Sequence, residues 1–417
     1  MYLTVKQRLK HLTTEEYASL RFLCRTAKNL ANQGIYNVRQ HYFQERKYLN
    51  YEKNYVLLKE SENYRILNSN MAQQILKSVD GSFQAFFKLR KLASEGKYPM
   101  HAARLPHYLP RDGFYPLIIR MIRINRDHTF VVPMSNGYAK EHGRIVIRLP
   151  EPLHDKKIKE IRILPRQNAR FFEVQYVYEA GTIMHDLDET KALAVDFGVN
   201  NLMACVSSTG QSFLIDGKRL KAANQWYNRQ LSRLQSIHDK QRIGRRRTRQ
   251  MQAVTYKRNQ YVGDYLHKAA KLVVDYCIQN RIGTLVAGYN VTFQRNVSLG
   301  KSNNQNFVMI PFGKLCQMLS YLCRLHGIAY VEQEESYTSK ASFWDRDEIP
   351  VYNDDNPRQY VFSGKRVKRG LYMTASGTVL NADINGALNI LRKSNVVSLT
   401  ALYARGAVDT PARIRVA

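Results

Sequence analysis

The spacing of apolar residues divides the first half of the chain into two regions of different period. Between residues 13 and 92 the apolar positions recur at helical intervals, which predicts a helical region of three or four helices. Residues 108–178 alternate with a period of two, in short runs separated by Asn, Gly, Pro and Asp. This second pattern predicts an antiparallel barrel or sandwich. A first strand over residues 2–10 could close that sheet, with the helices as an insertion.

The second half begins with the four apolar residues Ala192–Val195, which predict a buried strand. The segments that follow it predict, in order, the strands LMACVSS and SFLID, a long helical stretch over residues 219–279, the strand GTLVAGYN, a helix from Pro311 to Gly327, the strand IAYVEQEES and a helix that opens at Asn381-Ala-Asp383. The order β-β-β-α-β-α-β-α is that of an RNase H-like fold. In this fold, carboxylates from the first strand and from later elements meet at one edge of the sheet.

Two aspartates lie at such positions. Asp196 directly follows the buried strand and precedes Gly198, which permits a tight turn, while Asp383 lies at the start of the last helix. Each also has a simpler reading, because an Asp after a strand often bonds its own turn and an Asp at a helix start often acts as an N-cap. Mg²⁺ prefers several oxygen ligands, and two such ions can promote phosphodiester cleavage. At least three convergent carboxylates are therefore expected of a nuclease site.

The third carboxylate must come from the fourth or the fifth strand of this half. The fourth strand ends in Gly288, whereas the fifth ends in Glu334 and Glu335. Because side chains alternate along a strand, only one of the two glutamates can face the aspartates. Glu335, nearer the strand end, is the preferred candidate and Glu334 the second; an exposed acidic pair is the alternative.

The amino-acid composition, through its net charge, indicates the class of partner. The chain of 417 residues holds 64 Lys and Arg against 34 Asp and Glu, a formal charge of +30, so its partner should be a polyanion. Nucleic acid is the leading candidate and an anionic membrane surface the alternative. No apolar run reaches about 18 residues, and the N-terminus lacks the apolar core of a signal peptide. We therefore expect a soluble, cytoplasmic, nucleoid-associated protein of prokaryotic type without a membrane partner.

Basic residues gather in one segment of the long helical stretch. Residues 240–258 contain eight Lys or Arg and no acid, which predicts a ridge that contacts a nucleic-acid backbone. The candidate contacts are Arg245, Arg246, Arg247, Arg249, Lys257 and Arg258. Arg162 and Arg166, on one side of a predicted strand, suit phosphate contact as well, or plain solvation.

With these residues identified, the sequence resembles the TnpB (OrfB) family of transposon-encoded proteins, relatives of the miniature type V CRISPR effector nucleases. The segments that carry the resemblance are DFGVNNL, LSRLQ, YLHKAAKLVV, NQNFVMIPFGKL, EESYTSKASF, FSGKRVKRGLY and NADINGALNIL. They span nearly the whole chain in the family's order.

The resemblance implies an α+β multidomain protein in which a β-barrel wedge domain, with an inserted helical recognition domain, precedes an RNase H-like (RuvC) α/β nuclease domain. The implied boundaries are 1–12 plus 108–180 for the wedge, 13–107 for the recognition domain, 181–190 for a linker, 191–393 for the nuclease domain with an insertion at 336–380, and 394–417 for a tail without a recognisable motif.

The implied activity is RNA-guided cleavage of double-stranded DNA beside a short transposon-adjacent motif, with Mg²⁺ or Mn²⁺ and a guide RNA as cofactors. Asp196 and Asp383 match the first and last RuvC aspartates of the family. Two departures stand out. Gly288 replaces the glutamate that many members carry on the fourth strand, and the insertion lacks the four cysteines of a zinc ribbon, so zinc is not expected. The alternative is a nuclease-inactive, RNA-guided DNA-binding protein, either a repressor or a transposition accessory. The sequence leaves the oligomeric state open.

Overall fold

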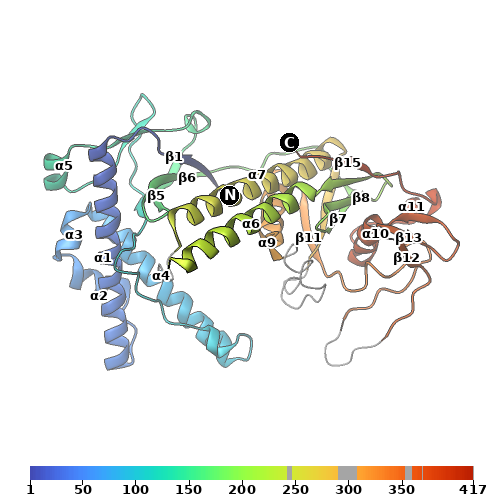
Figure 1. The fold of residues 1–417 in the computed structure, drawn as a ribbon, viewed down its shortest axis with the longest axis horizontal. Coiled ribbons are helices and arrows are strands. Elements are labelled where there is room, and N and C mark those ends of the chain that lie inside the picture. Colours follow the sequence, from blue (N-terminus) through green and yellow to red (C-terminus); the bar gives the residue numbers. More distant parts are fainter. Residues whose placement is uncertain (242–246, 290–307, 353–358, 369, 417) are drawn as a thin grey trace. The chain divides into compact units, whose positions relative to one another are not determined.

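The computed structural model describes residues 1–241, 247–289, 308–352, 359–368 and 370–416 (Figure 1). The chain forms a mixed α and β structure with two compact units, Met1–Ala180 and Gly181–Ala417. None of the described helices combines the length and the apolar character that a membrane crossing requires.

Helices in the first unit are concentrated in its N-terminal half. The helices are α1 (Thr14–Glu45), α2 (Tyr51–Leu58), α3 (Glu62–Ile66), α4 (Ser69–Ser94) and α5 (Asn136–His142), with short 3₁₀ turns at Met100–Ala102 and Glu151–Leu153. Thr13 and Glu16 start α1 with a reciprocal capping box, as the sequence predicted. Helix α5 was not predicted, because it lies inside the region where the sequence alternates with a period of two.

The strands of the first unit form two antiparallel sheets. The larger has the order β1 (Tyr2–Arg8), β6 (Phe171–Glu179), β5 (Ile158–Arg166) and β2 (Leu117–Ile119), and the smaller pairs β3 (Thr129–Val131) with β4 (Val146–Arg148). The first strand thus pairs with the last one, with all the helices between them in sequence. A closed barrel stays a prediction.

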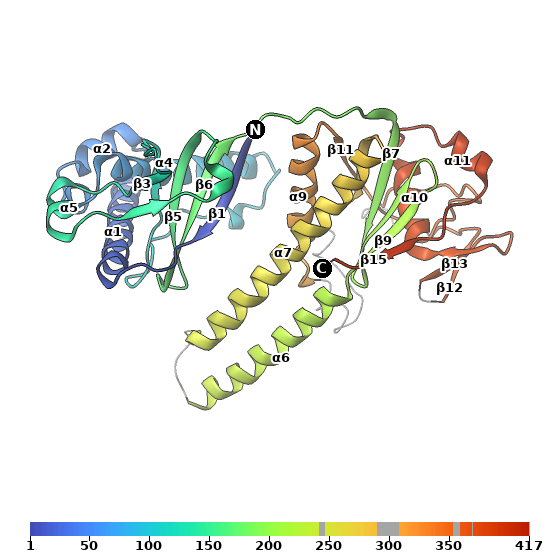
Figure 2. The same ribbon diagram turned by 90° about the horizontal axis from the view of Figure 1, so that it is seen from above.

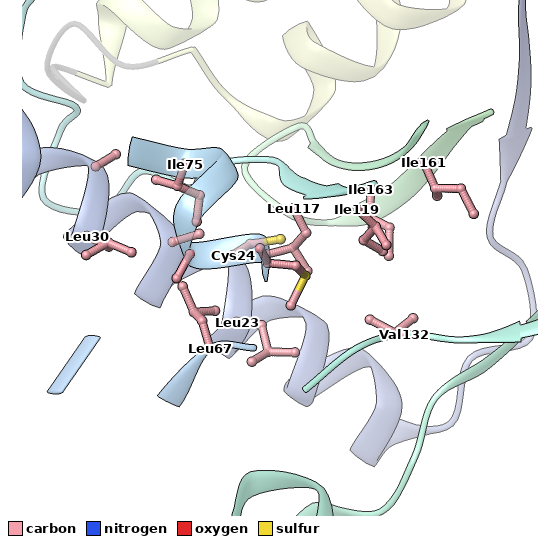
Figure 3. Close-up of a cluster of buried hydrophobic side chains, with 14 of the residues drawn as sticks. Leu23, Cys24, Leu30, Leu67, Ile75, Leu117, Ile119, Val132, Ile161 and Ile163 are labelled. Atoms are coloured by element: carbon pink, nitrogen blue, oxygen red, sulfur yellow. The ribbon is translucent and has the colours of Figure 1, made fainter. Parts of the chain in front are cut away.

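One hydrophobic core joins the helices of this unit to its larger sheet. Leu23, Cys24 and Leu30 of α1 lie in the same buried cluster as side chains of β2 and β5 (Figure 3). Leu117 and Ile161 from the sheet are fully buried there. The helical and β regions differ in the spacing of their apolar residues, but these residues pack into one common hydrophobic core.

The second unit is organised on a six-stranded mixed sheet. Its order is β11 (Ala329–Gln333), β10 (Ile282–Gly288), β7 (Asp188–Phe197), β8 (Asn201–Ser207), β9 (Ser212–Asp216) and β15 (Ala412–Ile414). Strands β7, β10 and β11 are mutually parallel, and β8 is antiparallel to both of its neighbours. The described strands of this sheet from β7 to β11 follow one another along the chain in the predicted order.

Helices cover both faces of this sheet. They are α6 (Lys218–Lys240), α7 (Arg249–Gln279), α9 (Phe312–Leu325), α10 (Ala382–Ser394) and α11 (Thr400–Arg405). Leu193 and Val195 of β7 pack with α7 and α9 in one core, whereas Ala192 and Ala194 pack with α10 in another. Helices α6 and α7 lie side by side as a long hairpin (Figure 2).

Two segments differ from their predicted roles. The predicted linker over residues 181–190 already enters strand β7 at Asp188. The tail after residue 393 is structured, because it forms α11 and then adds β15 to the edge of the sheet beside β9. The insertion at 336–380 contains a small antiparallel sheet of β12 (Lys365–Lys368), β13 (Leu371–Met373) and β14 (Val379–Asn381).

Candidate carboxylate site in the second unit

The alternation along β7 directs the Asp196 side chain toward α10. Ala192 and Ala194, four and two residues earlier, pack on that face, and Asp196 continues their series. A Cβ added at Gly386 of α10 would lie 2.9 Å from Oδ2 of Asp196, so the helix backbone approaches this carboxylate closely. The glycine thereby leaves the space that the half-buried Asp196 occupies.

The three parallel strands end at the same level. Val195 pairs with Ala287 of β10, and the next residue of β10, Gly288, pairs with Gln333 of β11. A Cβ at Gly288 would lie only 2.3 Å from Cδ1 of the buried Ile390 on α10. A side chain at this end of β10 would therefore require Ile390 to move, and the acids at the ends of these strands are Asp196 on β7 and Glu334 and Glu335 after β11.

The two glutamates after β11 have different surroundings. Glu334 accepts hydrogen bonds from Nζ of Lys393, near the end of α10, and from the backbone N–H of Ser336. Burial alone would raise the pKa of Glu334, but these bonds and the charge of Lys393 outweigh it and lower the pKa. Glu335 instead interacts electrostatically with Asp196. Lys393 thus holds Glu334, whereas Glu335 is subject to the charge of Asp196.

Asp383 lies in the first turn of α10, where Asn381 is the N-cap and accepts bonds from the backbone N–H groups of Asp383 and Ile384. The Asp383 carboxylate is therefore not the cap of its own helix. Its Oδ2 accepts a 2.7 Å hydrogen bond from Nδ2 of Asn201, and its Oδ1 lies 3.6 Å from a guanidinium nitrogen of Arg366 on β12.

Electrostatic repulsion links these carboxylates in pairs. Burial raises the pKa of Asp196 to about 7, and the charge of Asp383 adds to this rise while Arg366 opposes it. Burial also raises the pKa of Glu335 to about 9, with further contributions from Asp196 and Glu334. Asp196 therefore takes part in both interactions, since the charge of Asp383 acts on it and its own charge acts on Glu335.

The carboxylates are the kind of ligand that suits a hard divalent cation, but they are not arranged as a complete metal site. Their oxygens are the donors that Mg²⁺ prefers, and their mutual repulsion is what a bound cation would relieve. Within the described part of the chain, however, no group of three or more His, Cys, Asp or Glu side chains is arranged to hold a metal ion. The expected three-carboxylate metal site is therefore present as coupled pairs and not as an assembled ligand set.

The candidate nucleic-acid contacts are only partly described. Arg245 and Arg246 lie outside the described residues, whereas Arg247, Arg249 and Lys257 are exposed. Lys257 lies over the ring of Trp226, 5.7 Å from its centroid.

Arg258 is engaged within the protein. Its Nε donates to Oδ1 of Asn224 at 2.8 Å and its guanidinium also donates to the carbonyl of Met309. Arg162 and Arg166, considered for phosphate contact, form ion pairs with Glu160 and Glu173.

Sequence reasoning missed three residues that hold the site. Asn201, in the DFGVNN segment, bonds Asp383, and its own Oδ1 accepts a 2.6 Å bond from Arg413 of β15. Arg366 faces Asp383 from the FSGKRVKRG segment. Asn201 and Arg366 stand in motifs that the sequence does display, but Arg413 lies in the tail, where no pattern marks it.

Comparisons with known proteins agree with this architecture. Residues 175–294 match the OrfB_IS605 family model, described as a probable transposase, and residues 312–390 match the Cas12f1-like TNB domain. The TnpB-like protein ORF457 of Acidianus two-tailed virus is 24% identical over 421 residues, which cover 90% of this chain and 83% of the relative. The predicted resemblance to TnpB-like proteins is confirmed.

A solved structure extends the similarity to the fold of most of the chain. The Cas12f1 chain in a cryo-EM structure of a Cas12f1–sgRNA–target DNA complex superposes with a TM-score of 0.60 at 14% sequence identity. The match covers 91% of this chain and 83% of the Cas12f1 chain. The TnpB-like resemblance therefore includes the three-dimensional arrangement of elements.

Proposed function

We propose that the protein is an RNA-guided DNA endonuclease of a transposon, with a RuvC-like nuclease domain over residues 191–393. The observation that carries the proposal is the coupling of Asp196 to both Asp383 and Glu335, three acids from distant parts of the chain at one end of parallel strands. The net charge of +30 supports a nucleic-acid partner. The Cas12f1 likeness supports a guide RNA and a target DNA as partners.

In this proposal Asp196, Glu335 and Asp383 hold divalent metal, Mg²⁺ or Mn²⁺, once nucleic acid is bound. The metal would supply positive charge for the attacking water and for the leaving oxygen of a phosphodiester. Asn201 holds the Asp383 carboxylate through a hydrogen bond, and Arg366 adds a positive charge beside it. The guide RNA would pair with one DNA strand, while the protein reads a short duplex motif next to the target.

The proposed boundaries of the N-terminal domains are those that the TnpB resemblance implies. Residues 1–12 and 108–180 would form the wedge and residues 13–107 the recognition domain, whose shared core makes them one folding unit. Arg247, Arg249 and Lys257 are the exposed candidates for contact with the nucleic-acid backbone.

A second function is favoured by a specific observation. No group of three metal-binding side chains is assembled among the described residues, and β10 ends in Gly288 instead of an acid. Both features favour a protein that binds DNA under the guidance of RNA without cutting it. Such a protein would act as a repressor or as a transposition accessory.

One experiment separates the two functions. The purified protein with its copurified RNA is incubated with Mg²⁺ and a plasmid that carries the sequence complementary to that RNA beside a randomised flanking motif. Linear plasmid that disappears in the Asp196→Ala and Glu335→Ala variants supports the endonuclease. The variant Glu332→Gln, an exposed acid on β11, serves as the matched control and should cut normally. Plasmid that is bound but stays intact with the unaltered protein supports the binding protein.

A further inference from the structure

The last helix carries a polar stripe that faces the segment after β11. Asn385, Asn389 and Lys393 follow one another at intervals of four residues on α10, so their side chains lie along one side of the helix. We call these residues the α10 stripe. The segment they face, residues 334–343, begins with the two glutamates of the candidate site.

Every member of the α10 stripe bonds the backbone of that segment. Asn385 donates from Nδ2 to the carbonyl of Ala341 at 2.8 Å and accepts from the backbone N–H of Phe343 at 3.2 Å. Asn389 donates from Nδ2 to the carbonyls of Thr338 and Ala341, at 2.8 and 2.7 Å. Lys393 donates to the carbonyl of Ser336 at 3.2 Å, to the Glu334 carboxylate and, outside the segment, to the carbonyl of Pro350 at 3.1 Å.

These contacts are buried, which makes them specific. Asn385 and Asn389 are completely buried, and the side chain of Lys393 is 9% exposed. A buried amide or ammonium group is unfavourable unless its hydrogen bonds are made, so the backbone of the segment can dock on α10 in one register only. Oδ1 of Asn389 is buried and has no hydrogen-bond partner among the residues that the structure describes, so the hydrogen bonds of this side chain there are the two that it donates.

The stripe is connected to Glu335 by one further residue. Thr338, whose carbonyl accepts from Asn389, donates from Oγ1 to the carbonyl of Glu335 at 2.8 Å. The backbone N–H of Thr338 points at the same carbonyl. Glu334, the neighbour of Glu335, is fixed by Lys393. The backbone on both sides of the Glu335 side chain is therefore tied to α10, the helix that also bears Asp383.

We propose that the α10 stripe positions Glu335 opposite Asp196, so that one helix sets the place of two of the three carboxylates. This inference rests on the proposed metal-dependent cleavage. Asn385, Asn389 and Lys393 are positioning residues in it, because they act on the carboxylate through the backbone of residues 334–343.

The test uses cutting of the protein backbone by iron, which reports where a metal ion lies without requiring DNA cleavage. Fe²⁺ bound in place of Mg²⁺ generates hydroxyl radicals with peroxide and ascorbate, and these cut the chain beside the ion. The full-length protein with its copurified RNA should yield fragments that end near residues 196, 335 and 383, located by mass spectrometry.

Two variants weaken the connection between the α10 stripe and Glu335 at different points. Asn389→Asp removes both donated bonds, and Thr338→Val removes only the hydroxyl bond to Glu335 while keeping the shape of the side chain. Ser394→Ala is the control, since Ser394 on the same helix bonds only the carbonyl of Leu391 within α10. Circular dichroism establishes that each variant is folded.

The expected result for both variants is loss of the fragments near residue 335 with retention of those near 383. The Fe²⁺ concentration for half-maximal cutting should rise roughly tenfold, as is usual when a group that orients a metal ligand is removed. Ser394→Ala should give the unaltered pattern. If Asn389→Asp does not fold, Thr338→Val decides the question.

Two outcomes overturn different claims. Unchanged fragments near residue 335 in folded Thr338→Val would refute the positioning role and leave the proposed nuclease standing. A lack of localised fragments in the unaltered protein would refute the metal site itself, and with it both proposals.

Discussion

The two units shift the pKa of their buried acids in opposite directions. In the first unit Glu160 is 6% exposed and bonds both Arg120 and Arg162, so its pKa is lowered although burial alone would raise it. In the second unit burial, and after it the charge of Asp383, raises the pKa of Asp196 to about 7, and the charge of Asp196 in turn contributes to the raised pKa of Glu335. Acids that maintain structure are neutralised by arginines of the same chain. The carboxylates around Asp196 repel one another, which is the arrangement expected where the balancing charge is a ligand.

The largest effect that this comparison predicts is on cleavage. Glu335→Gln should reduce the rate of plasmid cleavage by on the order of 10²- to 10³-fold, because a neutral amide no longer contributes to holding the metal charge at the reacting phosphate. Cleavage time courses at saturating Mg²⁺ measure this change. Glu160→Gln, which neutralises a buried acid in the other unit, is the control and should cut at nearly the normal rate. Equal losses in both variants would contradict a special role for the second unit.

The next largest effect is on stability: replacing Asp196 should stabilise the protein, whereas most substitutions of buried residues destabilise it. Between its ordinary pKa of 3.8 and its raised pKa of about 7, folded Asp196 holds a proton that the unfolded chain has released. Stability therefore falls as pH rises through this window. Asp196→Asn should stabilise the metal-free second unit at about pH 8, by up to about 4 kcal/mol at ~1.4 kcal/mol for each pKa unit, and leave it unchanged below about pH 4.

Thermal unfolding in chelator, followed across this pH range, measures that stabilisation. Ser394→Ala, which alters no carboxylate, should show the pH dependence of the unaltered protein. A variant Asp196→Asn that is equally or less stable at about pH 8 would show that the ionised Asp196 carboxylate is not unfavourable in the folded protein.

The smallest predicted effect is a loss of stability on replacing Glu160, opposite in sign to the gain expected for Asp196→Asn. Glu160→Gln should destabilise the first unit by about 1 kcal/mol, because Arg120 and Arg162 lose an ionised partner. The value is small since the two arginine side chains are 59% and 47% exposed and keep part of their hydration. For Glu160 the folded-state pKa is lowered, so its contribution is present at neutral pH and disappears as pH falls below about 4. Denaturant titration at neutral and acid pH measures both values.

Local pattern was sufficient to predict most of the site-bearing elements. The apolar run before Asp196 and the caps around Asp383 are properties of neighbouring residues, and they located β7 and α10. The position of Glu335 nearer the strand end also favoured it over Glu334, and burial, followed by the charge of Asp196, raises the pKa of Glu335. Its role as a metal ligand stays a prediction.

The remaining features depend on contacts between distant residues, which leave no periodic trace in the sequence. Arg413 approaches Asn201 only because β15 adds to the sheet beside β9, and a three-residue strand after a helix gives no strong pattern. The pairing of Arg162 with Glu160, and of Arg166 with Glu173, depends on strand register. Arginines that suited phosphate contact by sequence are for this reason engaged within the sheet.

The most direct test of the central claim is the change in thermal stability of the second unit when Mg²⁺ is added at about pH 8. If Asp196, Glu335 and Asp383 together bind the ion, Mg²⁺ should raise the unfolding midpoint of the unaltered protein, as any ligand of the folded state does. The same addition should leave Asp196→Asn and Glu335→Gln unchanged. An equal rise in all three proteins, or no rise in any of them, would contradict a metal site built from these carboxylates.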